Sequence, residues 1–241
     1  MNKIKCPCCE SFKIVKNGIQ PTNLKQKYLC KDCQRQFVLE PQKQKISDEK
    51  KQLIDKLLLE KISLEGISRV VEVSSRWLQD YVNEKYDQVK KKLNVRSPAT
   101  KELIVQCDEM WSYCGNKQNK QWVWIAMNKQ TREIVGLHIG GRTVKDAYAL
   151  WKSLPQSYQE NAFFFTDFYS AYNVTLPTDS HQSVSKNTGL TNYIERFNNT
   201  LRQRVARLAR KTLSFSKKTD NHIASIWYFV HHYNASLKIF E

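Results

Sequence analysis

The sequence lacks the long apolar segments that membrane insertion and secretion require. No hydrophobic run in its 241 residues approaches the length of a spanning helix, and the N-terminus carries no apolar signal core. These absences argue against a membrane partner and against export. We therefore expect a soluble protein of the cytoplasm.

Acidic residues are scarce relative to basic ones. The chain has 39 Lys and Arg against 23 Asp and Glu, a formal charge of +16. The charge is also unevenly placed, because the run from Arg196 to Lys218 contains eight basic residues and no acid. Such a concentration of positive charge indicates a polyanionic partner, most commonly nucleic acid.

Cysteine, in contrast, is concentrated near the N-terminus in two Cys-x-x-Cys pairs. Their spacing suits two hairpin knuckles that close on one tetrahedral metal ion, and four thiolates favour Zn²⁺. Disulfides are the alternative, which an intracellular protein disfavours. Cys8 is interpreted as a non-ligand because pairing Cys6 with Cys9 keeps the two knuckles symmetric. Residues 1–40 are therefore predicted to form a zinc ribbon, with the ligands Cys6, Cys9, Cys30 and Cys33.

Residues 41–95 have the spacing of a helix-turn-helix domain. Ser47 to Lys50 reads as a helix start with acids in the first turn, and further apolar residues at helical spacing flank a turn at Glu72–Ser74. Arg76 and Gln79 on the last helix are the expected contacts with a major groove. Small helical bundles that bind no DNA share this pattern and are the alternative.

The third region, residues 101–241, changes to β-rich periodicity. Three strands in a meander, a helix, a short apolar strand, a second helix, a further strand and a long helix are predicted in that order. The strands lie within residues 103–113, 121–128, 133–141, 162–167 and 181–186, and the first and last helices within 144–154 and 188–218. This is the order of a ribonuclease H-like domain. The predicted fold class is thus a multidomain α/β protein with a ribonuclease H-like catalytic domain after a small zinc ribbon and a helix-turn-helix domain.

The last of these helices combines an apolar stripe with a basic surface. Apolar residues recur at three- and four-residue spacings and face a core: Leu190, Ile194, Phe197, Leu201, Val205 and Leu208. Glu195 flanks this stripe as a single carboxylate. A solvated amphipathic helix in which Glu195 forms an ordinary ion pair is one interpretation. The other is a DNA-binding surface, formed by Arg196, Arg204, Arg207, Arg210 and Lys211.

Three acids could meet in this domain. Asp108 follows the apolar run of the first strand and Asp167 ends that of the fourth, so both lie near the sheet centre if these strands are neighbours, and Glu195 approaches from the helix. Clustered carboxylates repel one another, and Mg²⁺ or Mn²⁺ relieves the repulsion and supports phosphoryl transfer. Only one of Asp108 and the adjacent Glu109 is expected to join this site, because successive strand side chains point to opposite faces, and alternation alone does not say which.

The order of these motifs, and above all the block Ile-Glu-Arg-Phe-Asn-Asn-Thr-Leu-Arg-Gln-Arg, resembles the transposases of the IS1 insertion-sequence family. The resemblance implies a DDE recombinase with catalytic Asp108, Asp167 and Glu195, and with Arg202 seven residues after the glutamate. It implies double-stranded DNA partners, namely terminal inverted repeats and target DNA, in the nucleoid of a bacterium or archaeon. Two ends must be held together, so at least a homodimer is expected. A DNA-binding regulator and a structure-selective nuclease of the same fold are the alternatives.

Overall fold

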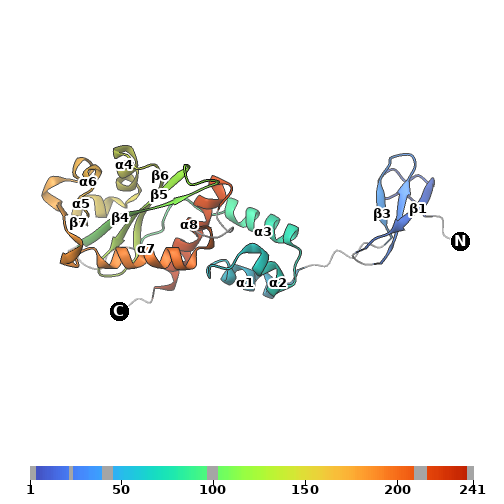
Figure 1. Ribbon diagram of the computed structural model, residues 1–241, viewed down its shortest axis with the longest axis horizontal. Helices are drawn as coiled ribbons and strands as arrows, with labels where there is room; N and C mark the ends of the chain where they lie inside the picture. The colour runs from blue at the N-terminus through green and yellow to red at the C-terminus, as the bar shows by residue number, and fades with distance from the viewer. Residues whose placement is uncertain (1–3, 22–23, 40–45, 97–102, 209–215, 238–241) are drawn as a thin grey trace. The chain divides into compact units, whose positions relative to one another are not determined.

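The computed structural model describes residues 4–21, 24–39, 46–96, 103–208 and 216–237. The chain divides into two compact units, Met1–Ser47 and Asp48–Glu241. The fold is mixed α/β, and the described residues contain two β-sheets and eight α-helices (Figure 1). None of the described helices has the length and apolar character needed to cross a membrane. The division into three domains, residues 1–40, 41–95 and 101–241, stays a prediction.

The first unit is a small antiparallel sheet. Its strands β1 (Ile14–Ile19), β2 (Gln26–Cys30) and β3 (Gln36–Val38) pair in chain order. Its interior is minimal, since Cys6 and Cys30 are the buried side chains among the described residues of this unit.

The second unit is built on a five-stranded sheet in the order β6-β5-β4-β7-β8. The first three strands form the predicted antiparallel meander: β4 (Leu103–Tyr113), β5 (Lys120–Asn128) and β6 (Ile134–Gly140). The other two, β7 (Ala162–Thr166) and β8 (His181–Ser183), run parallel to β4. The expectation that the first and fourth strands are neighbours is confirmed, because β4 pairs with β7.

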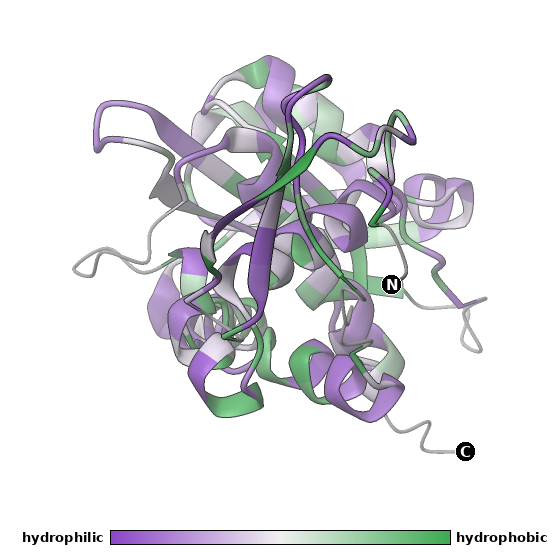
Figure 2. Cartoon of the chain, turned by 90° about the vertical axis from the view of Figure 1, so that its right-hand side faces the viewer, coloured by the Kyte–Doolittle hydropathy of each residue, from purple (hydrophilic) through white to green (hydrophobic). Residues whose placement is uncertain are grey.

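Helices cover both faces of this sheet, as Figure 1 shows. One face carries α4 (Val144–Ser153), α5 (Gln156–Asn161) and α6 (Ser170–Thr175), and the other carries α7 (Asn192–Arg204) and α8 (Thr219–Ser236). Strand alternation divides the core in two, since Val105 and Cys107 of β4 pack toward α4 and α6 while Met110 packs toward α7 and α8. Hydrophilic residues occupy much of the outward helix surface (Figure 2).

Three short helices precede the sheet in the same unit, namely α1 (Asp48–Leu57), α2 (Leu64–Val71) and α3 (Ser75–Asp87). The side chain of Ser63 caps α2 and that of Ser74 caps α3 by accepting backbone N–H bonds. Glu72 adopts a left-handed φ of 56° between the two helices, where the sequence predicts a turn. Helical spacing after Leu64 and Ile67 predicts that Val70 is buried. The structure instead buries Val71 and leaves Val70 63% exposed.

Helix α7 is shorter than the predicted helix over residues 188–218, because it ends at Arg204. The Lys61 N–H donates to the Arg204 carbonyl oxygen at 2.7 Å, and Arg204 itself reaches the Leu59 carbonyl and Glu60. The chain after α1 therefore binds the end of α7. Val205 and Leu208 still join the core, now beyond the helix end.

Candidate active site

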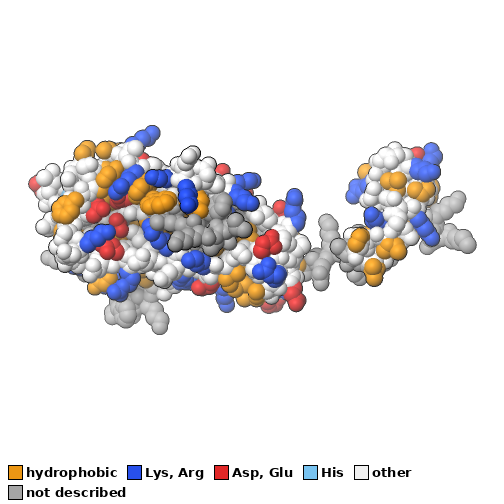
Figure 3. Space-filling view, in the orientation of Figure 1, with side chains coloured by type: hydrophobic (Ala, Val, Ile, Leu, Met, Phe, Trp, Pro, Cys, Tyr) orange, Lys and Arg blue, Asp and Glu red, His pale blue; other side chains and the backbone are white. Residues whose placement is uncertain are grey.

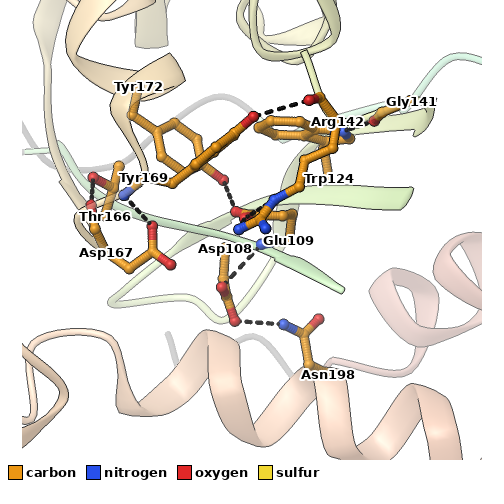
Figure 4. A network of polar contacts seen from close by, with 10 residues as sticks. All are labelled: Asp108, Glu109, Trp124, Gly141, Arg142, Thr166, Asp167, Tyr169, Tyr172 and Asn198. Atoms are coloured by element: carbon orange, nitrogen blue, oxygen red, sulfur yellow. Dashed lines mark hydrogen bonds and ion pairs between the residues drawn. The ribbon is translucent and has the colours of Figure 1, made fainter. Parts of the chain in front are cut away.

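Three carboxylates gather at one level of the sheet. The parallel register pairs Gln106 of β4 with Phe165 of β7, so Asp108 in β4 and Asp167, which directly follows the last residue of β7, lie near the same level of the sheet. One oxygen each from Asp108, Glu109 and Asp167 lies within 4.8 Å of the others (Figure 4). This arrangement offers a divalent cation the hard oxygen ligands that it prefers.

Asp108 points toward α7. Its Oδ2 accepts a hydrogen bond from Asn198 Nδ2 at 2.7 Å, and its Oδ1 accepts one from the Glu109 N–H at 2.9 Å. Burial, together with the negative charges of Glu109 and Asp167, raises the pKa of Asp108 to about 7. The other amide atom of Asn198, Oδ1, is buried and has no hydrogen-bond partner in the part of the chain that the structure describes. The site therefore concentrates negative charge and an unused oxygen acceptor around one strand position.

Because of this raised pKa, Asp108→Asn is expected to stabilise the magnesium-free protein at pH 8. A carboxyl whose pKa rises from 3.8 to about 7 on folding favours the folded state below pH 4, and this contribution is lost as the pH rises through 7. The loss amounts to at most about 4 kcal/mol. Urea unfolding at pH 5 and pH 8 measures this loss. The free energy of unfolding should fall between these pH values by more in the wild type than in the variant, and equal falls in both proteins would contradict the raised pKa of Asp108.

Glu109 departs from the expectation. Its side chain does leave β4 toward the opposite face, where Arg142 and Tyr172 lie. Its carboxylate nevertheless has an oxygen within 4.8 Å of oxygens of Asp108 and Asp167. A glutamate side chain is long enough to bend back past the strand, so alternation alone does not exclude it. Burial and the charge of Asp167 raise the pKa of Glu109, while hydrogen bonds from Arg142 and Tyr172 oppose the rise.

Arg142 is the cation that faces Glu109. Its Nη2 and Nε donate to Glu109 Oε1 at 2.6 and 3.1 Å, and Tyr172 OH donates to Oε2 at 3.0 Å. The guanidinium is stacked between the rings of Trp122 and Tyr169, with centroid distances of 4.3 and 4.2 Å. Tyr169 OH also donates to the Arg142 carbonyl oxygen. These contacts fix a planar cation beside a carboxylate that is 1% exposed.

Removal of the Arg142 side chain should destabilise the folded protein, because it leaves the buried Glu109 carboxylate with fewer hydrogen-bond donors. Arg142→Ala is expected to lower the free energy of unfolding by about 2 kcal/mol, a value reduced for the 40% exposure of the arginine side chain. Adding Glu109→Gln removes the buried charge, so the double variant should recover about half of the loss. Urea unfolding of the four proteins tests this, and strictly additive effects would show that the two side chains are not coupled.

Helix α7 is attached to β4 next to these acids. The Gln106 side chain is fully buried, donates to the Leu190 carbonyl oxygen at 2.6 Å and accepts from the Ile194 N–H at 3.0 Å. Glu195 follows directly, and its Oε1 accepts a hydrogen bond from Thr191 Oγ1 at 2.9 Å. Among the described residues, the acids within 4.8 Å of one another do not include Glu195. Arg202 lies further along the same helix, half-buried.

The predicted DNA contacts have diverse surroundings. Arg76 is exposed and pairs with Asp80 at 3.2 Å, while Gln79 Nε2 donates to Asn83 Oδ1. Of the other predicted residues, Arg196 is exposed and Arg204 pairs with Glu60. The Arg207 guanidinium lies 5.6 Å from the Tyr86 ring centroid. Arg210 and Lys211 lie outside the described residues. The basic surface is thus not one continuous helix face.

The four N-terminal cysteines form a second cluster, with one Sγ from each within 4.8 Å of the others. Cys6 Sγ lies 3.5 Å from Cys33 Sγ, and Cys9 Sγ lies 3.5 Å from Cys30 Sγ. Cys8 is exposed and contributes its backbone N–H, which donates to Cys6 Sγ at 3.4 Å. Burial raises the pKa of the Cys6 thiol, but the backbone N–H groups of Cys9 and Cys8 outweigh this and lower the pKa to about 6.

Both knuckles share one backbone geometry, offset by 24 residues. The N–H of the residue after each second cysteine, Glu10 or Gln34, donates to the carbonyl of the first cysteine, and both residues have a left-handed φ, of 56° and 60°. The next residues, Ser11 and Arg35, accept from the N–H of that first cysteine. Four converging thiols on two equivalent turns could bind Zn²⁺.

Comparisons with known proteins relate this chain to transposases. The family profile described as IS1 transposase matches residues 102–234. The insertion element iso-IS1n protein InsB of Shigella dysenteriae is 34% identical over 128 residues, which cover 53% of this chain and 94% of that protein. The IS1 protein InsB of Shigella flexneri is 35% identical with the same coverage, and the IS1 4 protein InsB of Escherichia coli K12 is 34% identical, with 74% of its length covered. The chain therefore belongs to the IS1 transposase family.

Proposed function

We propose that the protein is a DNA transposase that binds the terminal inverted repeats of an insertion sequence, cleaves DNA there and joins the released ends to target DNA. The observation that carries the proposal is the meeting of Asp108 in β4 with Asp167, which directly follows the adjacent parallel strand β7. The sheet order, three antiparallel strands followed by two parallel ones, supports assignment to the ribonuclease H-like fold. Family membership supports the same role.

The residues at this site fit divalent cations. The donors are carboxylate oxygens, and Asn198 Oδ1 is a buried acceptor without a partner among the described residues. Burial raises the pKa of Asp108, and the neighbouring carboxylates raise it further through a repulsion that a cation would relieve. Asp108 and Asp167 would hold Mg²⁺ or Mn²⁺, with Glu195 of α7 as the third carboxylate. When bound, the cations activate the attacking oxygen and stabilise the leaving one.

The chain's own groups arrange the substrate and the acids. Arg142 and Tyr172 neutralise Glu109 and hold it in place, which leaves Asp108 and Asp167 as the acids without a cationic partner in the hydrogen bonds around the site. Arg202 on α7 would position a phosphate near the site. The N-terminal zinc ribbon and the helices around Arg76 and Gln79 would select the inverted repeats, and a homodimer or larger assembly would hold two ends together.

Incubation of the full-length protein with Mg²⁺ and a labelled duplex carrying the element ends tests this function. Joined products with a target plasmid are expected. Cleavage without joining would favour the structure-selective nuclease, and specific binding without cleavage would favour the regulator. Either of these two results would overturn the proposal.

A further inference from the structure

A cavity of about 440 Å³ lies within the second unit, between α2 and α3 on one side and the 3₁₀ helix η3 (Ala206–Leu208) and the start of α8 on the other. Apolar side chains form part of its lining, among them Leu58, Leu64, Tyr86 and Val205. None of the three carboxylates of the candidate active site lines it. This volume falls in the range that holds one small organic ligand or nucleotide, and excludes a duplex.

Three amide side chains border the cavity and are joined through one atom. Asn83 Oδ1 accepts from Gln79 Nε2 at 2.9 Å and from Asn221 Nδ2 at 3.0 Å. Within the described part of the chain, no hydrogen bond is formed by Asn83 Nδ2 or by Gln79 Oε1. A donor and an acceptor therefore remain for the edge of a planar polar ligand.

The rim of the cavity is positively charged. Arg207, Lys217 and Lys218 line it together with a single acid, Glu65, which accepts a hydrogen bond from Ser75. Lys218 is also the N-cap residue of α8, and no side chain caps this helix end. The two lysines and Arg207 thus place positive potential at this rim, and the first-turn N–H groups of α8 add a contribution that Asp220 in the same turn partly offsets. Figure 3 shows Lys and Arg side chains around this junction of α1–α3 with α7 and α8.

We propose that this cavity binds one unpaired nucleotide of DNA, with the base against the apolar lining, its edge toward Asn83 and Gln79, and its phosphate at Lys217 and Lys218. The inference rests on the proposed function, because strand cleavage leaves an end whose last nucleotide can leave the duplex at a cost of a few kcal/mol. Charge complementarity favours this occupant over an apolar peptide, which would leave three cations without partners. Sites for single strands combine positive charge with an aromatic ring on which a base can stack, and Tyr86 is the aromatic residue in this lining.

Anisotropy titration of the full-length protein with fluorescein-labelled hexathymidine tests the site. Lys217→Gln with Lys218→Gln should weaken binding about tenfold and reduce the slope of log K against log salt by about 0.7, the value for one lost single-strand phosphate contact. Asn83→Leu should weaken binding about fivefold without changing the slope, because it removes a base contact. Lys90→Gln with Lys91→Gln is the matched control, since both lysines are exposed and line no part of this cavity.

The outcomes separate this site from the proposed function. Asp108→Asn should bind hexathymidine as the wild type does, and circular dichroism should show that each variant melts like the wild type. If the wild type joins element ends but the Lys217 and Lys218 variant binds the probe unchanged, or if the control pair weakens binding equally, the nucleotide site is refuted and the transposase stands. If the wild type joins no ends yet the predicted losses appear, the site stands and the transposase is refuted.

Discussion

Asp108→Asn and Asp167→Asn are each expected to reduce DNA strand cleavage and strand transfer by about a thousandfold or more, with little change in the binding of element ends. Each substitution keeps the side-chain volume and removes the charge that holds a divalent cation, which contributes several kcal/mol to transition-state stabilisation. Glu195→Gln should have an equally large effect if α7 supplies the third ligand. Arg202→Ala should give an intermediate loss, because its proposed role is to position a phosphate and not to bind a cation.

Asp179→Asn provides the matched control for these variants. Asp179 is an exposed acid that forms no part of the acid cluster, so its loss should leave activity within about twofold of the wild type. Gel-shift and strand-transfer assays on the same preparations separate binding from chemistry. Robust transfer by Asp108→Asn or Asp167→Asn would mean that other carboxylates bind the cations.

Glu109→Gln separates the two adjacent acids of β4. If Glu109 serves only to hold Arg142 and Tyr172, the amide keeps part of these contacts and activity should survive. If Glu109 is itself a ligand, the variant should be as inactive as Asp108→Asn. This comparison is needed because Asp108 and Glu109 both have a carboxylate oxygen within 4.8 Å of one from Asp167.

The sheet could be predicted from sequence because its strands carry strong local signals. The apolar run Ala162–Phe165 indicates a strand beside the long central strand, and β7 does pair with β4. Only one face of β7 is buried, because Ala162, Phe164 and Thr166 are buried while Phe163 is 36% exposed. Asp108 and Asp167 follow at the ends of apolar runs, so two of the three predicted acids came together as expected. Their meeting depends only on the pairing of two neighbouring strands.

Other features depend on contacts between distant segments and have no local signal. The end of α7 at Arg204 lacks a glycine or proline and follows instead from the bond donated by the Lys61 N–H. Gln106 and Asn198 were missed because neutral amides form no motif until the fold brings α7 against β4. The role of Arg142 was missed for the same reason, since its partner Glu109 lies 33 residues away.

Cys30→Ser is expected to release one zinc ion per chain and to unfold the described residues of the first unit, while the second unit stays folded. Only Cys6 and Cys30 are buried among those residues, so almost no apolar core remains to hold the three strands without metal. Structural zinc sites supply about 10–16 kcal/mol to folding in small domains, far more than the half-buried Tyr28 and Phe37 pair can replace.

Elemental analysis and limited proteolysis measure the two parts of this prediction, with Cys8→Ser as the matched control. Cys8 is exposed and interacts with the cluster through its backbone N–H, which serine retains, so this variant should keep its zinc and resist protease like the wild type. Unfolding of the first unit alone should also differ from unfolding of the whole chain. Fragments beginning near Asp48 should survive proteolysis of Cys30→Ser, because the second unit has its own core on both faces of its sheet. Full zinc content in Cys30→Ser, or equal zinc loss in Cys8→Ser, would show that the four predicted thiolates are not the ligand set.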